Sequence, residues 1–282
     1  MMKSMGIVGG GQMGSGIAQV AAQAGMDVIV VENSPQRLTR ATTTVAKNLD
    51  RLVKKGKLSE EAKAEIMGRI RTTTDLDALA AAPLVVEAIS ERKELKVQLF
   101  ESLCAICGED TLLATNTSSL SVTELAAVTK RPDRFIGLHF MNPVPMMQLV
   151  EVIRGLATSD ETFAAACGLV EQLGKTVVCS QDYPGFLVNR ILIPMINEAC
   201  YALMEGVGSV EDIDKAMTLG CNHPLGPLAL ADLIGLDIVE AILKVLHEGT
   251  GDQKYRPCPL LRRYVAAGFL GRKSGRGFHQ YT

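Results

Sequence analysis

The sequence contains no tryptophan, and aromatic residues make up only 4% of its 282 positions. Proteins that bind single-stranded nucleic acid stack bases on aromatic side chains, so this composition argues against such a role. The formal net charge of −2 provides no basic field that would attract nucleic acid or an anionic membrane. No apolar run reaches the roughly 20 residues that span a bilayer. We therefore expect neither nucleic acid nor a membrane as a partner.

The sequence also lacks the pattern of a disulfide framework. Its seven cysteines are odd in number and scattered, which indicates a reducing compartment. The N-terminal residues pass directly into a strand and a glycine turn, without the apolar segment of a signal peptide. We therefore expect a soluble cytoplasmic protein. Cys104 and Cys107 have C-x-x-C spacing, but they fall near the predicted C-terminal end of a helix. A redox motif sits at a helix N-terminus, so we favour core packing for this pair.

What the chain does have is a regular alternation of apolar strands and helices, with 47% apolar residues, enough for two packed domains. Strands are predicted at residues 4–8, 28–31, 84–89, 112–115, 135–140, 147–153 and 176–179. Helices are predicted at 14–24, 35–55, 92–106 and 159–173, with shorter ones after the capping residues Ser59 and Ser121. This order predicts a Rossmann-like α/β domain over residues 1–182, with a doubly wound, mostly parallel sheet.

Beyond D-Y-P-G at residues 182–185, no strong strand pattern follows. Helical periods continue at residues 186–205, 209–219, 227–247 and 260–267. Residues 183–282 are therefore predicted to form an all-helical C-terminal domain.

A glycine motif, G-G-G-Q-M-G at residues 9–14, matches G-x-G-x-x-G between the first strand and the first helix. In this context Gly9 permits a tight turn, Gly11 lets the backbone approach a pyrophosphate, and Gly14 lets helix and strand pack closely. The helix N-terminus then presents N–H groups to phosphate. The alternative is a simple turn. The motif predicts a dinucleotide site with contacts from Gly9, Gly11, Gln12, Met13 and Gly14.

Glu32 ends the second strand, 18 residues after Gly14. A carboxylate there can accept hydrogen bonds from the adenosine ribose hydroxyls and would repel a 2′-phosphate, so NAD is favoured over NADP. Arg37 lies within one helical turn and could soften that repulsion, which keeps NADP as an alternative. A solvated carboxylate at the end of a strand is the structural alternative for Glu32.

The stretch I-G-L-H-F-M-N-P-V-P-M-M-Q-L-V-E-V, residues 136–152, places His139 and Glu151 in an otherwise apolar run. Ligands bind beyond the carboxyl ends of strands in open α/β sheets, and both His139 and N-T-S-S at 116–119 fall at such ends. A reversal centred near Pro145 would bring Glu151 opposite His139, since each is six residues from it. The carboxylate would then fix the tautomer of the ring. His139 is a candidate general base, and the alternative is a structural core histidine.

A basic cluster, Arg51, Lys54, Lys55 and Lys57, lies at the end of the second predicted helix. It is either a solvated surface or a clamp for the phosphates of a carrier-linked substrate.

Together these motifs resemble those of the short-chain L-3-hydroxyacyl-CoA dehydrogenases, the bacterial 3-hydroxybutyryl-CoA dehydrogenases in particular. The likeness covers essentially the whole chain. The segments that carry it are G-G-G-Q-M-G, V-V-E-A-I-S-E, N-T-S-S-L, H-F-M-N-P-V-P, L-V-E-V-I, D-Y-P-G-F-L-V-N-R, E-D-I-D-K-A-M, N-H-P-L-G-P and G-R-K-S-G-R-G-F. The resemblance implies an oxidoreductase that interconverts an (S)-3-hydroxyacyl-CoA, such as (S)-3-hydroxybutyryl-CoA, and a 3-oxoacyl-CoA with NAD(H).

The resemblance also implies roles for individual residues. His139 would be the general acid/base and Glu151 its partner, while Ser118 and Asn189 would hydrogen-bond the substrate oxygens, at a site between the two domains. The implied cofactor contacts are Glu32, Glu91, Lys96, Asn116, Ser118 and Asn142. The implied CoA contacts are Asn48 and one of Lys54 and Lys55. The helical domain would bind substrate and mediate homodimerisation, and no metal site is implied.

Two positions depart from the family pattern, and two other functions compete. Glu32 stands where aspartate is usual, which lengthens the ribose contact by one methylene. His279 stands where an aromatic residue is common, and we assign it no function. A dehydrogenase of free 3-hydroxy acids would share both domains but would not need the basic cluster. An inactive dinucleotide-binding protein is the other alternative, although the intact set of Ser118, His139, Glu151 and Asn189 speaks against it.

Overall fold

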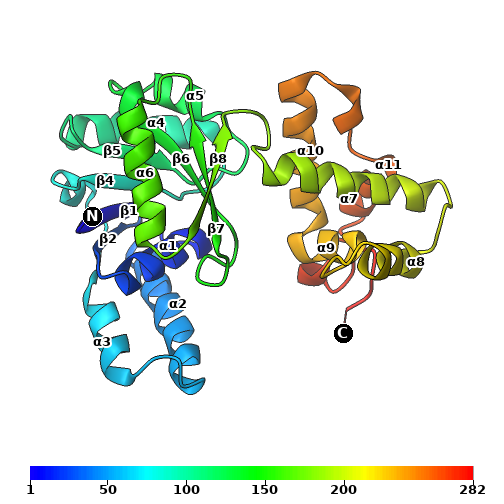
Figure 1. The fold of residues 1–282 in the computed structure, drawn as a ribbon, viewed down its shortest axis with the longest axis horizontal. Coiled ribbons are helices and arrows are strands. Elements are labelled where there is room, and N and C mark those ends of the chain that lie inside the picture. Colours follow the sequence, from blue (N-terminus) through cyan, green and yellow to red (C-terminus); the bar gives the residue numbers. More distant parts are fainter. Residues whose placement is uncertain (282) are drawn as a thin grey trace. The chain divides into compact units, whose positions relative to one another are not determined.

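The computed structural model describes residues 1–281 and divides the chain into two compact units, Met1–Tyr183 and Pro184–Thr282 (Figure 1). The boundary predicted from the sequence falls one residue earlier, after residue 182. Within residues 1–281, no helix combines the length and the apolar character that crossing a bilayer requires.

The first unit is built on an eight-stranded sheet in the order β3-β2-β1-β4-β5-β6-β7-β8. The strands are β1 Ser4–Val8, β2 Asp27–Val31, β3 Ile70–Thr73, β4 Leu84–Glu87, β5 Leu112–Thr115, β6 Phe135–Phe140, β7 Leu149–Arg154 and β8 Thr176–Gln181. Strands β1 to β6 pair in parallel, β7 is antiparallel to β6, and β8 is parallel to β7. The predicted Rossmann-like, mostly parallel sheet is confirmed.

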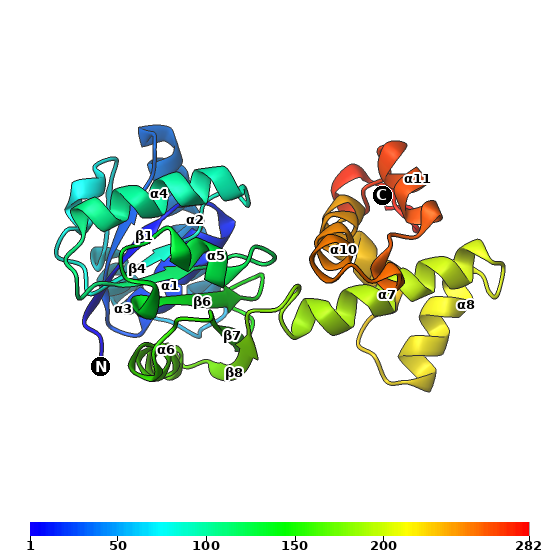
Figure 2. The ribbon, with the colours of Figure 1, turned by 90° about the horizontal axis from the view of Figure 1, so that it is seen from above.

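Helices cover both faces of this sheet. They are α1 Gln12–Gln23, α2 Pro35–Lys54, α3 Glu60–Gly68, α4 Lys93–Ile106, α5 Val122–Ala127 and α6 Asp160–Gln172. Helices α4 and α5 lie on one face, and α1 and α6 lie on the other (Figures 1 and 2). The main core joins apolar side chains of α1 and α6 to those of the strands. Serine caps set the starts of α3 and α5, because Ser59 and Ser121 accept hydrogen bonds from backbone N–H groups three residues on.

The strand order places a switch point between β1 and β4. The chain passes from β1 to β2 on one side and later returns to β4 on the other, so the connections diverge at the carboxyl ends of these strands. The glycine motif follows β1, Glu32 follows β2, and N-T-S-S follows β5. His139 is the penultimate residue of β6. The residues of interest in this unit therefore share one edge of the sheet.

The second unit is all-helical, as predicted. Its helices are α7 Val188–Met204, α8 Val210–Lys215, α9 Pro227–Ile234, α10 Leu236–Thr250 and α11 Pro259–Ala266, with a π-helical turn at Ala216–Gly220. Their apolar faces form a separate core. The single helix predicted at 227–247 is wrong, since Gly235 (φ 106°) ends α9 and separates it from α10.

Three other local predictions need correction. Strand β3 was not predicted, and it is a four-residue strand at the edge of the sheet with no fully buried residue. The strand predicted at 84–89 ends at Glu87, and the one predicted at 147–153 runs from Leu149 to Arg154. The cysteine prediction holds for Cys107, which follows the last residue of α4 and is buried, and burial raises the pKa of its thiol. Cys104 is only half-buried.

Candidate active site

The glycine turn has the stereochemistry that a dinucleotide requires. Gly9 has φ 103°, and a Cβ there would lie 2.5 Å from the carbonyl oxygen of Ala88. A Cβ on Gly14 would lie 1.7 Å from the carbonyl oxygen of Gly9, so helix α1 could not pack this closely on the turn. By contrast, a Cβ on Gly11 would meet no protein atom within 4 Å. Gly9 and Gly14 are therefore demanded by the fold itself, whereas Gly11 leaves open space above the turn.

Helix α1 begins at Gln12, directly after Gly11, and no side chain caps its N-terminus. Its first N–H groups and the positive end of its dipole suit a phosphate at this position. The open space at Gly11 lies at the same end of the helix. The turn therefore fits the pyrophosphate of NAD.

Glu32 lies at the rim of this turn and is held by backbone groups. Its Oε1 accepts a hydrogen bond from Gly10 N (2.8 Å), and its Oε2 accepts one from Asn33 N (3.1 Å). Arg37 Nη1 lies 3.8 Å from Oε2, and its own side chain is 65% exposed. Glu32 and Arg37 both line a cavity of about 490 Å³ with apolar walls that include Ile89 and Leu95. A carboxylate beside an apolar wall suits the ribose and the base of an adenosine.

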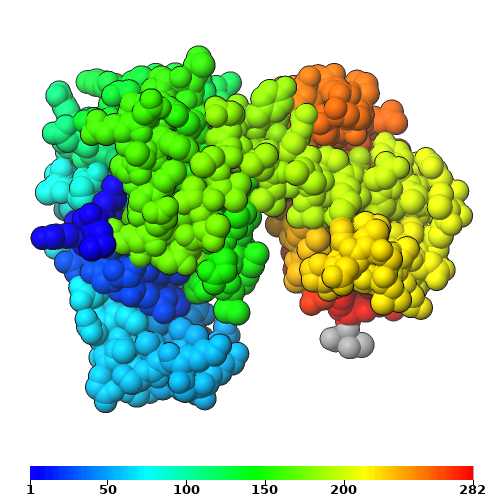
Figure 3. Space-filling model, viewed as in Figure 1, coloured from blue at the N-terminus to red at the C-terminus, as the bar shows by residue number. Residues whose placement is uncertain are grey.

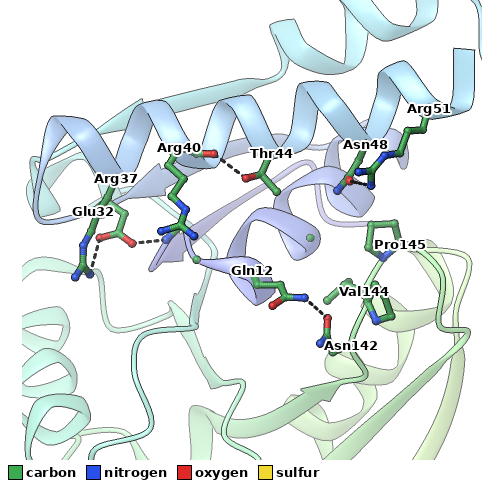
Figure 4. Close-up of a pocket in the computed structure, with 14 residues that line it drawn as sticks. Gln12, Glu32, Arg37, Arg40, Thr44, Asn48, Arg51, Asn142, Val144 and Pro145 are labelled. Carbon is green, nitrogen blue, oxygen red and sulfur yellow. Dashed lines mark hydrogen bonds and ion pairs between the residues drawn. The ribbon is translucent and has the colours of Figure 1, made fainter. Parts of the chain in front are cut away.

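A second cavity, of about 610 Å³, lies along one face of α2 (Figure 4). The side chains from α2 are Arg37, Arg40, Thr44, Asn48 and Arg51. They face Gln12 and the N-P-V-P link at 142–145. Gln12 Nε2 donates to Asn142 Oδ1 (2.9 Å), and a Cβ on Gly16 would lie 2.8 Å from Val144 Cβ. The link thus packs directly on α1, and the cavity is basic along its α2 wall.

The structure separates the residues implied for CoA. Asn48 lines the larger cavity, while Lys54 and Lys55 are exposed beyond it, at the end of α2. The end of α2 and helix α3 (light blue to cyan) form an exposed lobe of the first unit (Figure 3). Arg40 lines the cavity but was not singled out in the sequence. The spacing of Arg37, Arg40, Thr44, Asn48 and Arg51 would have placed it on the same helix face.

His139 and Glu151 form a buried pair. They are direct partners in the antiparallel register of β6 and β7, so the predicted chain reversal is confirmed. Nδ1 of His139 lies 2.6 Å from Oε2 of Glu151. Glu151 is fully buried and His139 is 7% exposed. A carboxylate beside Nδ1 favours the imidazole tautomer that carries its proton on Nδ1, and the lone pair of that tautomer is on Nε2.

The N-T-S-S loop, residues 116–119, lies beside this pair. Asn116 Oδ1 accepts a hydrogen bond from Phe140 N (3.0 Å), the residue after His139. Asn116 therefore joins the loop to the strand that carries the histidine.

The carboxylate of Glu91 accepts several hydrogen bonds from the same loop. Its Oε1 accepts hydrogen bonds from Thr117 Oγ1 (2.5 Å), Ser118 N (2.9 Å), Ser119 N (3.1 Å) and Ser119 Oγ (3.0 Å), and Ser118 Oγ lies 3.4 Å away. Burial raises the pKa of Glu91. Nevertheless Lys96 and the donors from the loop hold the pKa below its usual range. Glu91 thus sets the position of Ser118.

Lys96 is almost fully buried between two carboxylates. Its Nζ lies 2.6 Å from Glu87 Oε1 and 3.1 Å from Glu91 Oε2. Glu87 has no exposed surface, and we did not predict it as a site residue. In the sequence it is a single acidic residue inside the apolar run predicted as a strand at 84–89.

Asn189 belongs to the second unit, where it lies in the first turn of α7 and is 8% exposed. His279, also in this unit, pairs with Asp214 through Nε2 and Oδ2 at 2.7 Å. The Asp214 carboxylate also accepts hydrogen bonds from Leu228 N and Ala229 N at the start of α9. His279 therefore has a structural role in fastening the C-terminal residues to this helix.

Comparisons with known proteins match both units. A family model described as 3-hydroxyacyl-CoA dehydrogenase, NAD binding domain, matches residues 4–183, and one described as 3-hydroxyacyl-CoA dehydrogenase, C-terminal domain, matches residues 185–281. The 3-hydroxybutyryl-CoA dehydrogenase of Bradyrhizobium diazoefficiens is 55% identical over 281 residues, which cover 100% of this chain and 96% of that protein. A probable 3-hydroxybutyryl-CoA dehydrogenase of Bacillus subtilis is 54% identical, with coverage of 99% and 98%. The crystal structure of (S)-3-hydroxybutyryl-CoA dehydrogenase from Ralstonia eutropha aligns over both full chains with a TM-score of 0.98 and 53% identity.

Proposed function

Because the chain belongs to the 3-hydroxyacyl-CoA dehydrogenase family, we propose that it interconverts (S)-3-hydroxybutyryl-CoA and acetoacetyl-CoA with NAD(H). The observation that carries this proposal is the buried pair of His139 and Glu151, with 2.6 Å between ring nitrogen and carboxylate. It lies on the same sheet edge as a glycine turn that fits a dinucleotide. An acid/base group beside a nicotinamide site is what oxidation of a secondary alcohol requires.

The residues that would hold the cofactor are those of the glycine turn together with Glu32, Glu91, Lys96, Asn116, Ser118 and Asn142. The chemistry that NAD supplies when bound is acceptance of a hydride from C3 of the substrate. Glu32 favours NAD, because a carboxylate that faces the ribose repels a 2′-phosphate.

His139 moves the proton in this proposal. In the oxidation direction Nε2 accepts the proton of the 3-hydroxyl as the C3–H bond breaks, and the hydroxyl oxygen becomes a carbonyl. The ring is then an imidazolium, which the charge of Glu151 stabilises through Nδ1. In the reduction direction the same nitrogen returns the proton to the oxygen. Ser118 donates a hydrogen bond that holds this oxygen in place, and the family resemblance implies the same role for Asn189.

The basic wall of α2 favours an acyl-CoA over a free acid. Arg40 and Arg51 line the larger cavity with Asn48, and guanidinium groups bind phosphate well. A free 3-hydroxy acid carries no phosphate, so its recognition would not require these guanidinium groups. We assign Asn48 to the CoA moiety, with Lys54 and Lys55 at its outer end.

One assay tests these assignments. The wild-type enzyme should oxidise NADH with acetoacetyl-CoA much faster than with free acetoacetate. Replacement of His139 by Gln should lower kcat by about 10²-fold to 10⁴-fold, because the acid/base group is removed. His247→Gln, in the last turn of α10, is the control and should keep wild-type activity. Equal rates with both substrates would favour the free-acid function, and a fully active His139→Gln would rule out this mechanism.

The proposal includes a homodimer formed through the second unit. Large apolar side chains on its surface support an interface there: Leu187, Ile191, Met204, Val207, Leu219, Leu233 and Ile238. Light scattering on the purified protein should give twice the chain mass, 30.2 kDa. Ile191→Lys should weaken the association, because its side chain is 70% exposed in the single chain. A monomeric wild type would contradict the dimer.

A further inference from the structure

A closed ring of hydrogen bonds and ion pairs lies beneath the N-T-S-S loop. Glu87 Oε2 accepts from Thr115 Oγ1 (2.7 Å), and Thr115 Oγ1 accepts from Thr117 N (3.3 Å). Thr117 Oγ1 donates to Glu91 Oε1, and Glu91 Oε2 faces Lys96. Lys96 returns to Glu87 Oε1 at 2.6 Å, which closes the ring.

Glu87 is the fixed point of this ring. It is fully buried at the end of β4, directly opposite Thr115 in the parallel register of β4 and β5. Its Oε1 also accepts a hydrogen bond from Ile89 N (2.7 Å). Lys96 and the Ile89 N–H can only donate, and both contact Oε1 of Glu87. Thr115 Oγ1 accepts from Thr117 N and donates its own proton to Oε2. Both oxygens of Glu87 therefore accept hydrogen bonds. A carboxylate satisfies all of them, although burial raises the pKa of Glu87.

Glu91, unlike Glu87 and Thr115, lies outside the sheet. Glu91 follows the end of β4 on a loop, and its side chain is 34% exposed. Its orientation depends on Lys96, whose ammonium is positioned by Glu87. Glu91 in turn accepts hydrogen bonds from Ser118 N and Ser119 N. A path of short contacts therefore leads from the buried carboxylate to the backbone of Ser118.

We propose that Glu87 is a positioning residue for the reaction: through Lys96 and Glu91 on one side and Thr115 on the other, it sets the position of Ser118. This inference rests on the proposed role of Ser118 in binding the substrate oxygen. Glu87 accepts hydrogen bonds from Lys96, Thr115 and the backbone N–H of Ile89. None of these three is a group assigned to the reaction, so Glu87 would act through the ring.

Glu87→Gln is the direct test, because it keeps size and one acceptor oxygen but turns an amide N–H₂ toward groups that are donors. The enzyme should stay folded by thermal melting, and its kcat/KM for acetoacetyl-CoA should fall by about 10-fold to 100-fold, the scale expected for misplacement of a binding group. Combination with Ser118→Ala separates positioning from general damage. If Glu87 acts through Ser118, the double variant should be little worse than Ser118→Ala alone. Losses that multiply in full would overturn the inference.

Two buried threonines, each of which donates a hydrogen bond through its hydroxyl group, supply a matched pair. Thr115 Oγ1 donates to Glu87 (2.7 Å) at the end of β5 near the loop, while Thr111 Oγ1 donates to Ala82 O (2.9 Å) at the opposite end. Thr115→Val should lower kcat/KM, and Thr111→Val should not. This pair carries the test if Glu87→Gln does not fold, and equal activity in the two variants would then overturn the inference.

Failure of the proposed function would look different. A wild-type enzyme that does not reduce acetoacetyl-CoA contradicts that function, whatever the variants do. The variants would then be compared by NADH binding, since the ring also holds the implied cofactor residues Glu91 and Lys96. Unchanged NADH affinity in Glu87→Gln would in that case overturn the role of Glu87.

Discussion

Replacement of Glu151 by Gln removes one charge from the buried pair and little volume. Glu151 is fully buried, and its Oε2 lies 2.6 Å from Nδ1 of His139. In the reaction proposed above, the ring becomes an imidazolium in the oxidation direction and starts as one in the reduction direction. Two unit charges about 4 Å apart interact by about 4 kcal/mol at the effective dielectric constant of a partly buried site. Loss of this energy from the transition state corresponds to about a 10³-fold lower kcat.

The assay is the oxidation of (S)-3-hydroxybutyryl-CoA by NAD at saturating concentrations of both, because the ring gains its charge in this direction. We expect kcat to fall with little change in KM, because the charge acts mainly when the ring is protonated. His279→Gln is a suitable control, since it breaks a second His–carboxylate pair, with Asp214, at nearly the same distance, 2.7 Å. That variant should keep its kcat. A Glu151→Gln enzyme that retains more than about a tenth of wild-type kcat would refute the electrostatic role of Glu151.

Three further predictions follow from the cofactor side of the site. Gly11→Ala should melt at nearly the wild-type temperature, because the added Cβ meets no protein atom. It should bind NADH more weakly in a fluorescence titration, because the Cβ enters the open space above the turn. Gly14→Ala should instead lower the melting temperature, because its Cβ would lie 1.7 Å from a carbonyl oxygen. Glu32→Gln should reduce the preference for NADH over NADPH by about tenfold or more in kcat/KM ratios, because it removes the repulsive charge and leaves Arg37 nearby; an unchanged ratio would contradict this role. The pKa of Glu91 is lowered in the folded protein, so its carboxylate stabilises the fold above its unfolded value of 4.5, and this stability is lost as the pH falls through the folded pKa. Glu91→Gln should therefore lose less melting temperature on acidification than the wild type does, and parallel curves would count against this linkage.

Much of the fold could be predicted from local patterns. Strands β1, β5 and β6 have the bounds that their apolar runs indicate, and Ser59 and Ser121 cap the helices that they were expected to start. The opposition of His139 and Glu151 followed from one chain reversal and an equal spacing on each side of it. These features depend on residues close in sequence, which is why the pattern alone was informative.

Features decided by tertiary contacts were missed. Gly235 interrupts a periodic apolar pattern that continues into α10, and one glycine costs a helix only about 1 kcal/mol. The apolar pattern at 227–247 therefore could not indicate that the helix is interrupted at Gly235. Strand β3 has no apolar run of its own and exists because it pairs with β2 at the sheet edge.

The ring at Glu87 shows the same limit within the site. Glu87 and Thr115 are 28 residues apart and meet only through the register of β4 and β5. Glu91 and Lys96 were implied as cofactor contacts by family resemblance, which gave no indication that they also hold the N-T-S-S loop. Buried polar networks of this kind join several strands, so no single stretch of sequence carries their signal.

The register of β6 and β7 also restricts how this protein can change in evolution. Side chains alternate between the two faces of a strand. Insertion or deletion of one residue in the link at 141–148 that moves β7 by one position along β6 would therefore change the antiparallel register of these two strands. Glu151 would then point to the opposite face of the sheet, and Val150 or Val152 would face the histidine. Substitutions within the link leave this register unchanged. A change in the length of the link would move the Glu151 carboxylate away from His139, although residue 151 itself is not replaced. Related chains that keep the His–Glu pair should therefore vary in the composition of this link while conserving its number of residues.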